Sequence, residues 1–197
     1  PCTAREKELF KRVAEAARQI GVPCYLIGGF VRDKLLSRST KDMDIVCVGD
    51  GIALAHRVAA LLDPAIKVNY FKTYGTAQIK YKDVEIEFVG ARRESYTENS
   101  RNPEVAPGTL EDDQLRRDFT INALAISLNE ADYGSLLDPF NGLEDLENKI
   151  IRTPLDPERT FSDDPLRMMR GIRFASQLHF ELHPETFQAI KDNAERI

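Results

Sequence analysis

The chain has 197 residues, of which 42% are hydrophobic and 30% charged, and its formal net charge is −5 at pH 7. This length supports one sizeable hydrophobic core or two small ones, and the composition is that of a globular protein. The acidic balance excludes nucleic-acid binding through overall positive charge, so any such binding must depend on local arginines or on a basic part outside this sequence.

The first half of the sequence predicts helices that alternate with short strands. Residues 3–20 carry apolar side chains at helical spacing, with Thr3 and Glu6 placed as a capping box and Gly21 after the last turn. A short helix follows Gly28, and a longer one is expected over residues 51–62. The expected strands are CYLI (24–27), MDIVCV (43–48), IKVNYF (66–71), TAQIKY (76–81) and VEIEFVG (84–90), with a hairpin corner at Lys82-Asp83. Strands that follow one another without intervening helices favour a mixed or antiparallel sheet.

The second half changes from mixed elements to helices. The polar stretch from Arg92 to Pro107 predicts a mobile loop, and residues 110–128 predict a helix followed by a strand. Beyond Ser162 the pattern is helical, and Leu166, Met169 and Ile172 share a face that we expect in the core. We therefore predict an α+β fold, with one domain over residues 1–140 and the start of a helical domain over residues 141–197.

Cysteine content and hydropathy indicate the compartment. Cys2, Cys24 and Cys47 are too few and too scattered for a disulfide framework or a zinc site, and no apolar run approaches membrane-spanning length. We therefore expect a cytoplasmic protein with no membrane partner. The chain begins without Met and ends in the polar sequence DNAERI, so we expect it to be part of a longer protein. Its oligomeric state does not follow from the sequence.

Paired carboxylates occur on two of the predicted strands. Asp42 and Asp44 alternate along one strand and therefore share a face, as do Glu85 and Glu87 on another. Neighbouring carboxylates repel one another, and a bound Mg²⁺ would relieve that repulsion. If the two strands are neighbours, one glutamate completes a cluster that suits two-metal phosphoryl transfer. The alternative is a solvated strand end, since a D-x-D pattern is common by chance.

The glycine pair before the short helix suggests a phosphate site. Backbone NH groups of Gly28 and Gly29 could cradle phosphates, and Arg32 lies one turn into the helix, within reach of the same groups. Asp33 is expected to orient a neighbouring arginine. The alternative is an ordinary glycine turn between a strand and a helix.

Two arginine-rich segments offer donors for a nucleotide. Arg117, Asp118 and Asn122 lie within one segment, for which helix-surface ion pairing is the alternative. In the second segment Asp164 and Arg167, followed by Arg170 and Arg173, present an acceptor and a fork of donors that could read a nucleobase edge. A charged, solvated helix face is the alternative there.

Four motifs taken together resemble a known family. GGFVRDKLL with KDMDIV, RRDFTINALA, DPFNGLEDL and DDPLRMMRGIRFA occur in this order between Tyr25 and Ile197. They resemble the class II tRNA nucleotidyltransferases, which comprise CCA-adding enzymes and bacterial poly(A) polymerases within the DNA polymerase β-like superfamily. The resemblance implies a catalytic head over residues 1–140 and a truncated neck over residues 141–197, joined by DPFNGLEDL as a hinge.

The resemblance also implies roles for individual residues. Gly28, Gly29 and Arg32 would contact the triphosphate, and Asp42 and Asp44 would bind Mg²⁺ or Mn²⁺, with Glu87 or its neighbour Glu85 as the third carboxylate. The residues implied to bind the nucleotide elsewhere are Arg117, Asp118, Asn122, Asp164, Arg167, Arg170 and Arg173. The Asp164–Arg167 pair would read CTP and then ATP. The family motif usually starts with Glu-Asp where this chain has Asp163-Asp164, which leaves the base-reading aspartate in place.

The implied activity is template-independent addition of CMP and AMP to the tRNA 3′ end, with pyrophosphate released. Bacterial poly(A) polymerases share these motifs but typically carry an arginine-rich signature where this chain has FKTYGTAQIKY, which favours CCA addition. A CC-adding or A-adding specialist and a catalytically silent binding module are further alternatives. We expect most tRNA contacts to lie in C-terminal domains outside this chain, so the chain alone is expected to extend tRNA poorly.

Overall fold

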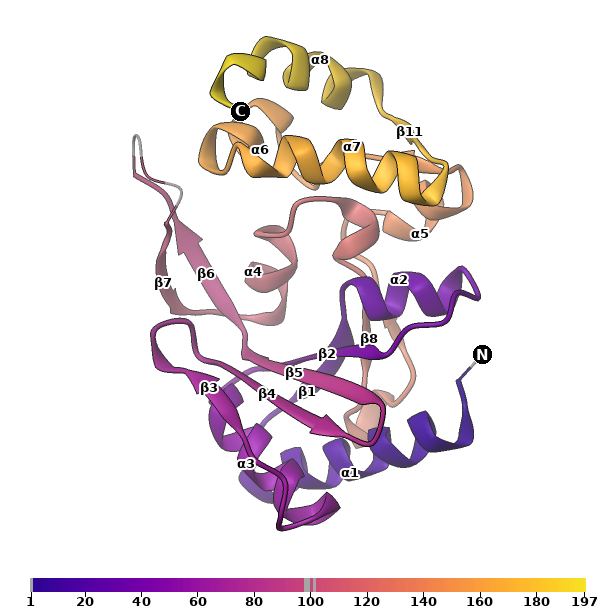
Figure 1. Cartoon of the computed structure of the whole chain (residues 1–197), viewed down its shortest axis with the longest axis vertical. Coiled ribbons are helices and arrows are strands. Elements are labelled where there is room, and N and C mark those ends of the chain that lie inside the picture. Colours follow the sequence, from indigo (N-terminus) through magenta and orange to yellow (C-terminus); the bar gives the residue numbers. More distant parts are fainter. Residues whose placement is uncertain (1, 98–99, 101) are drawn as a thin grey trace.

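A computed structural model describes residues 2–97, 100 and 102–197 of the chain. A mixed sheet with the strand order β3-β4-β5-β2-β1-β8-β9 forms its centre (Figure 1). These strands are β1 (Cys24–Ile27), β2 (Asp42–Cys47), β3 (Asn69–Phe71), β4 (Thr76–Tyr81), β5 (Val84–Gly90), β8 (Ala125–Ser127) and β9 (Leu136–Leu137). Within this sheet β2 and β5 pair in parallel and the other neighbours pair antiparallel. The predicted α+β class and mixed sheet are confirmed, although β3 is shorter than residues 66–71.

Two long helices cover one face of the sheet. Helix α1 (Ala4–Ile20) starts at the predicted Thr3–Glu6 capping box, and α3 (Gly51–Leu62) lies beside it (Figure 1). Met43 and Ile45 of β2 point to this face and are fully buried in the core that α1 and α3 complete. Side chains alternate along a strand, so Asp42 and Asp44 point to the opposite face.

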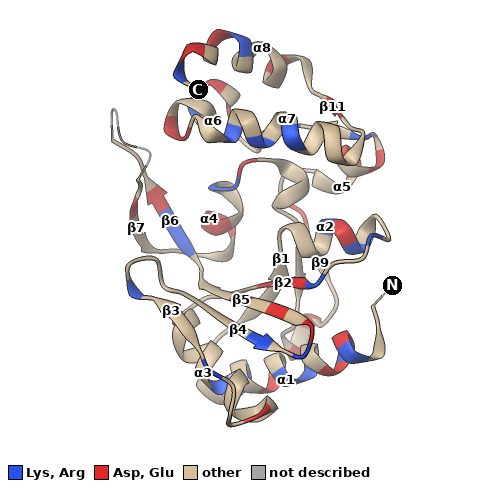
Figure 2. Ribbon diagram, viewed as in Figure 1, with Lys and Arg blue, Asp and Glu red and all other residues tan. Residues whose placement is uncertain are grey.

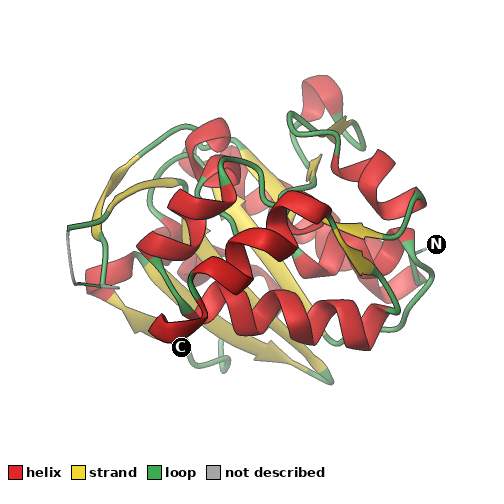
Figure 3. Ribbon diagram, turned by 90° about the horizontal axis from the view of Figure 1, so that it is seen from above, coloured by secondary structure: helices red, strands yellow, loops and turns green. Residues whose placement is uncertain are grey.

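The opposite side of the sheet carries short helices and then a helical layer (Figures 1 and 3). The elements nearest the sheet are α2 (Gly29–Leu35), α4 (Leu110–Leu115) and the 3-10 helix η2 (Thr120–Asn122); the other 3-10 helices are η1 (Lys72–Tyr74), η3 (Glu130–Asp132) and η4 (Ala194–Arg196). The helical layer comprises α5 (Gly142–Glu147), α6 (Pro157–Asp163), α7 (Leu166–Leu178) and α8 (Pro184–Asp192), with β10 (Ile150–Ile151) and β11 (Glu181–Leu182) paired in parallel. Among the described residues, none of the helices is both long enough and apolar enough to cross a membrane.

Phe119 joins the helical layer to the rest of the core. Its ring is fully buried and meets Phe174 of α7 edge to face, with 6.1 Å between ring centroids. Gly171 allows this approach, because a Cβ there would lie 3.0 Å from Phe119 Cζ. One hydrophobic cluster therefore runs from α1 to α8, and a domain boundary between residues 140 and 141 stays a prediction.

The predicted loop over residues 92–107 is largely a hairpin. Strands β6 (Arg92–Ser95) and β7 (Glu104–Pro107) pair antiparallel, so the expectation of a mobile loop is wrong for these residues, while residues 98, 99 and 101 lie outside the described part. The polar side chains that suggested a loop are held by ion pairs, such as Arg92 Nη2 with Glu94 Oε1 at 2.9 Å.

The buried face of α7 also differs from the prediction. Leu166, Met169 and Ile172 are exposed, and the core face instead consists of Met168, Gly171, Phe174 and Leu178. The helix carries two apolar stripes, and only one of them can meet Phe119. The stripe that contains Gly171 is the one that lets the helix approach closely enough.

Candidate active site

A cleft of about 750 Å³ lies between the exposed face of the sheet and α7. Figure 2 shows basic segments of α7 above acidic segments of β2 and β5. The predicted site residues on its wall are Gly29, Arg32, Asp42, Asp44, Glu85, Glu87, Arg117, Asp118, Asn122, Asp164, Arg167, Arg170 and Arg173. Gly28 is the predicted site residue that does not line it. Residues far apart in the sequence thus meet in one place.

The carboxylates come from two adjacent parallel strands. The register places Asp42 opposite Glu85 and Asp44 opposite Glu87, which confirms that the two predicted strands are neighbours. The pKa of Asp44 is raised to about 6, chiefly by burial and also by the neighbouring charges of Glu87 and Asp42, while the charge of Arg117 opposes the rise. The ionised form of Asp44 is therefore less favoured than in a free aspartate, and a bound cation would restore it.

The donor set fits a hard divalent cation. Carboxylate oxygens are the ligands that Mg²⁺ prefers, and Mg²⁺ usually takes one or two protein carboxylates together with water and substrate phosphates. In the described part of the chain, no three His, Cys, Asp or Glu side chains are gathered closely enough to form a complete protein-only site. Asp42 and Asp44 would hold the cation, and Glu87 as a third ligand stays a prediction.

The absence of a side chain at Gly28 leaves room for Arg117 and Asp44 beside it. Gly28 has φ = 74°, and a Cβ there would lie 3.0 Å from Arg117 Nη1 and 3.5 Å from Asp44 Oδ2. Its backbone NH donates to the Leu124 carbonyl at 3.2 Å, so this NH does not point to a phosphate. Of the glycine pair, Gly29 lies on the cleft wall, and nucleotide binding by either glycine stays a prediction.

A chain of hydrogen bonds crosses the cleft wall from α2 to α7. Arg32 donates from Nη1 to Asn122 Oδ1 at 2.6 Å, and Asn122 Nδ2 donates to Asp118 Oδ1 at 3.1 Å. Asp118 Oδ2 in turn accepts from Arg170 Nε at 2.6 Å. Asp33 accepts from Arg32 Nε at 3.0 Å, as expected for a residue that orients an arginine. Because Asp118 and Asn122 are buried, the alternative of a solvated helix surface does not describe them.

Three guanidinium groups surround one aromatic ring. The Cζ atoms of Arg32, Arg170 and Arg173 lie 5.0, 5.1 and 4.9 Å from the centroid of Phe174. Arg32 and Arg170 are also ion-paired, with Asp33 and Asp118, and a polyanion in the cleft would give the three cations a further partner. Sequence reasoning did not single out Phe174, because an aromatic residue on a helix is usually core.

The predicted base-reading pair lies where α6 ends and α7 begins. Asp164 Oδ1 accepts from the backbone NH of Leu166 at 3.1 Å, and α7 begins at Leu166, so one helix does not run through both Asp164 and Arg170 as expected. Arg167 Nη2 donates to the Arg116 carbonyl at 2.8 Å and to Tyr96 Oη at 3.3 Å. Both members of the pair line the cleft.

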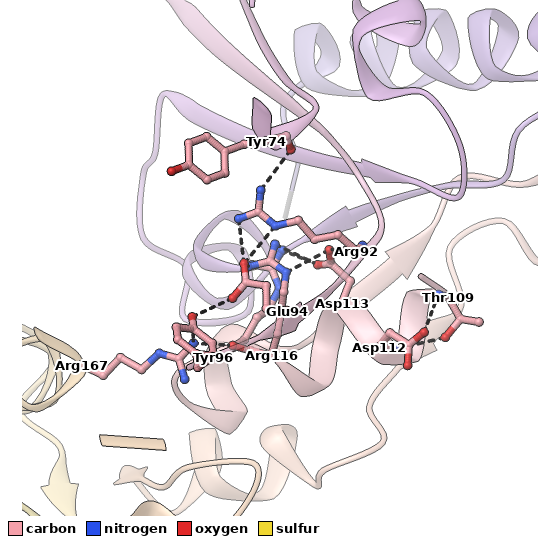
Figure 4. A network of polar contacts seen from close by, with 10 residues as sticks. Tyr74, Arg92, Glu94, Tyr96, Thr109, Asp112, Asp113, Arg116 and Arg167 are labelled. Carbon is pink, nitrogen blue, oxygen red and sulfur yellow. Dashed lines mark hydrogen bonds and ion pairs between the residues drawn. The ribbon is translucent and has the colours of Figure 1, made fainter. Parts of the chain in front are cut away.

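A second network was not found from the sequence (Figure 4). Glu94 accepts from Tyr96 Oη at 2.8 Å and pairs with Arg116 Nη1 at 3.4 Å, in addition to Arg92. Asp113 is fully buried and accepts from Arg117 Nη2 at 3.0 Å and from Arg116 Nε at 3.2 Å. The spacing of Asp113 three and four residues before these arginines was a local signal, whereas the pairing of Glu94 with Arg116 joins residues far apart in the sequence.

The family described as the poly A polymerase head domain matches residues 24–152, and the chain belongs to this family.

Several of the similar proteins are named as tRNA nucleotidyltransferases or CCA-adding enzymes. The chain is 44% identical over 167 residues to an A-adding tRNA nucleotidyltransferase of Aquifex aeolicus, covering 85% of this chain and 20% of that protein. It is 41% identical over 187 residues to a CCA-adding enzyme of Lactobacillus helveticus, covering 94% of this chain and 44% of that protein. A solved tRNA nucleotidyltransferase complexed with a primer tRNA and an incoming ATP analog matches with a TM-score of 0.80 and 39% identity, over 93% of this chain and 50% of that one. The chain thus spans less than half the length of these curated relatives.

Proposed function

We propose that the chain is the catalytic part of an enzyme that adds CMP and AMP to the 3′ end of tRNA, using CTP and ATP. The observation that carries this proposal is that Asp42 and Asp44 line the same cleft as Asp164 and Arg167. One pair suits phosphoryl transfer and the other suits recognition of a base. The similarity to A-adding and CCA-adding enzymes supports the proposal.

In the proposed reaction the tRNA 3′ oxygen forms a bond to the α-phosphorus while the bond from that phosphorus to the pyrophosphate oxygen breaks. Arg32 and Arg117 would hold the triphosphate, since both are fixed by hydrogen bonds on the cleft wall. Mg²⁺ or Mn²⁺ held by Asp42 and Asp44 would lower the pKa of the attacking hydroxyl and neutralise charge on the phosphoryl oxygens. Asp118 and Asn122 would shape the ribose pocket.

We propose residues 1–140 as the catalytic head and residues 141–197 as the beginning of a neck that recognises the base. Arg167 supports this division, because it belongs to α7 of the proposed neck and its side chain lines the cleft. Its Nη2 also donates to the Arg116 carbonyl of the proposed head. Most contacts to the body of the tRNA would then come from outside these residues.

A second candidate is an enzyme that adds only the terminal A. The identity of 44% to an A-adding relative, against 41% to a CCA-adding one, is the observation that favours it. A CC-adding specialist and a poly(A) polymerase share the same residues and are outcomes of the same test.

The test supplies tRNAs that end before, within and after the CC, with labelled CTP or ATP. CCA addition predicts ordered incorporation of C, C and one A. Incorporation of A alone on tRNA ending in CC would identify an A-adding enzyme, C without A would identify a CC-adding one, and long A tails would identify a poly(A) polymerase. No incorporation by the full-length protein on any of these substrates would contradict nucleotidyl transfer to tRNA.

Replacing Arg167 by lysine is expected to relax base selection. Lysine keeps the positive charge but loses the planar fork of donors, and a bidentate contact to a base is worth about 1–3 kcal/mol of discrimination. We expect the preference for CTP and ATP over UTP and GTP, measured as a ratio of kcat/KM, to fall roughly tenfold or more. Arg159→Lys is the matched control, because Arg159 is exposed on α6 and does not line the cleft. An unchanged preference in Arg167→Lys would contradict the role in base reading.

A further inference from the structure

An exposed aromatic pair stands at the edge of the sheet beside the cleft. Phe71 of the edge strand β3 is 66% exposed, and Tyr74 of η1 is 41% exposed. The register places Phe71 opposite Thr76, which lines the cleft, and paired residues of neighbouring strands point to the same face. Phe71 therefore stands on the face of the sheet that carries the carboxylates.

A row of residues leads from this edge to the carboxylates. The register connects Asn69 of β3 to Gln78, Gln78 to Glu87 and Glu87 to Asp44. Phe71 lies two residues after Asn69, on the same face of β3. Three strand spacings separate β3 from β2, which is roughly 14 Å. A strand of a few nucleotides can span this distance with its 3′ end at the carboxylates.

Two cationic side chains lie beside the pair, and one of them, Arg92, is also ion-paired with Glu94. The Arg92 guanidinium lies 5.7 Å from the centroid of the Tyr74 ring, and its Nη1 donates to the Tyr74 carbonyl at 3.1 Å (Figure 4). Lys72, between the two aromatic residues, is also exposed. Exposed aromatic rings combined with basic side chains are typical of surfaces that bind single-stranded nucleic acid, where bases stack on the rings and cations contact the backbone.

The geometry of phosphoryl transfer favours an attacking RNA strand that enters from the β3 side of the carboxylates. Arg32 lies on α2, which packs against β1 and β2, and Arg117 Nη1 lies beside Gly28 at the end of β1, so the proposed triphosphate takes that side of the carboxylates. In-line displacement requires the attacking oxygen and the leaving pyrophosphate to be on opposite sides of the phosphorus. The strand that attacks must then arrive over β5 and β4, past the aromatic edge.

We propose that Phe71, with Tyr74 and Arg92 beside it, forms a stacking platform for an unpaired base upstream of the reacting 3′ end. The identity of the strand as the RNA substrate rests on the proposed function, whereas the platform itself is a binding surface that can be measured without catalysis. Its occupant is single-stranded RNA, and stacking gives it little preference among bases.

A fluorescent oligoribonucleotide tests the platform. The probe is a short single strand with 2-aminopurine a few positions before its 3′ end, and binding to the full-length protein without nucleotide is followed by quenching of this base as it stacks. Phe71→Ala is expected to weaken binding about tenfold and to abolish the quenching, because removal of one base–aromatic stack has an effect of this order. Phe71→Tyr is expected to retain both. Phe187→Ala is the matched control, since Phe187 is an exposed ring on α8 with Lys191 Nζ 5.7 Å from its centroid.

Different results separate failure of the platform from failure of the proposed function. If the wild-type protein incorporates nucleotides and Phe71→Ala leaves both the RNA affinity and the KM for RNA within twofold, the platform is contradicted and the function stands. If the wild-type protein binds and quenches the probe but incorporates nothing into tRNA, the function fails and the platform stands. A concentration-dependent dimer of the wild type that Phe71→Ala abolishes would show that a second copy covers this edge, and would overturn the proposal.

Discussion

Asp42→Ala is expected to lower the rate of nucleotide incorporation by roughly a thousandfold, about 4 kcal/mol in transition-state stabilisation, while leaving the fold intact. Asp42 is exposed and lies outside the hydrophobic core, so its loss leaves no cavity. Its carboxylate shares a face with Asp44 and would be one of the protein ligands for the cation. Single-turnover incorporation of labelled nucleotide measures the rate, and thermal unfolding followed by circular dichroism checks the fold.

The two glutamates of β5 provide the comparison. Glu87 is in register with Asp44, whereas Glu85 is in register with Asp42, nearer the end of the sheet, and receives a hydrogen bond from Gln78 Nε2 at 3.4 Å. We expect Glu87→Ala to approach the loss seen in Asp42→Ala, and Glu85→Ala to change the rate less than tenfold. Undiminished incorporation by Asp42→Ala would remove the assignment of these carboxylates to the cation. A larger loss of rate in Glu85→Ala than in Glu87→Ala would make Glu85 the third ligand in place of Glu87.

Local periodicity explains which parts of the fold were predictable. Alternation over β2 separates Met43 and Ile45, which are buried, from Asp42 and Asp44, which face the cleft, and this separation can be read directly from the residue order. The start of α1 is equally local, because a capping box needs only Thr3 and a glutamate three residues later.

Long-range partners explain what could not be predicted. The hairpin β6–β7 has a polar sequence that is typical of a loop, and Glu94 in it pairs with Arg92 of the same strand and with Arg116 at the end of α4. On α7 the sequence contains two apolar stripes of similar spacing. Phe119, which is distant in the sequence, packs against the stripe that contains Gly171, so that stripe is the buried one. The residues of the candidate site were found where four motifs occurred together, since no single motif distinguished a site from a charged surface.

The buried carboxylate of Asp113 supports a further expectation about both stability and function. Its side chain is 0% exposed, and its oxygens accept from Arg116, from Arg117 and from the backbone NH of Arg92, the last at 3.2 Å. Both arginine side chains are only 17% exposed. Removal of one partner from a buried ionic cluster leaves the remaining charges uncompensated, which typically costs 3–5 kcal/mol. We expect Asp113→Asn to lower the free energy of unfolding by about 3 kcal/mol.

The dependence of this loss on pH follows from the direction of the pKa shift. Burial alone would raise the pKa of Asp113, but the charges of Arg117 and Arg116, with hydrogen bonds from Arg117 and the Arg92 backbone NH, outweigh it and hold the pKa below its usual range. A carboxyl group with a lowered pKa in the folded state contributes stability above its unfolded pKa and loses it as the pH falls through the folded value. The difference in unfolding free energy between the wild type and Asp113→Asn is therefore expected to be full at pH 7 and to shrink below about pH 4.

Denaturation by urea at pH 7 and at successively lower pH measures this difference. Glu111→Ala is the control, because Glu111 is exposed on the same helix and surface substitutions usually change stability by less than about 0.5 kcal/mol. Asp113→Asn is also expected to raise the KM for the nucleotide more than it lowers kcat, since Asp113 holds Arg116 and Arg117 at the cleft without lining it. A loss below 1 kcal/mol with the same KM would mean that the two arginines keep their positions without this carboxylate. Equal losses at pH 7 and pH 3 would mean that packing, and not the charge on Asp113, accounts for its effect.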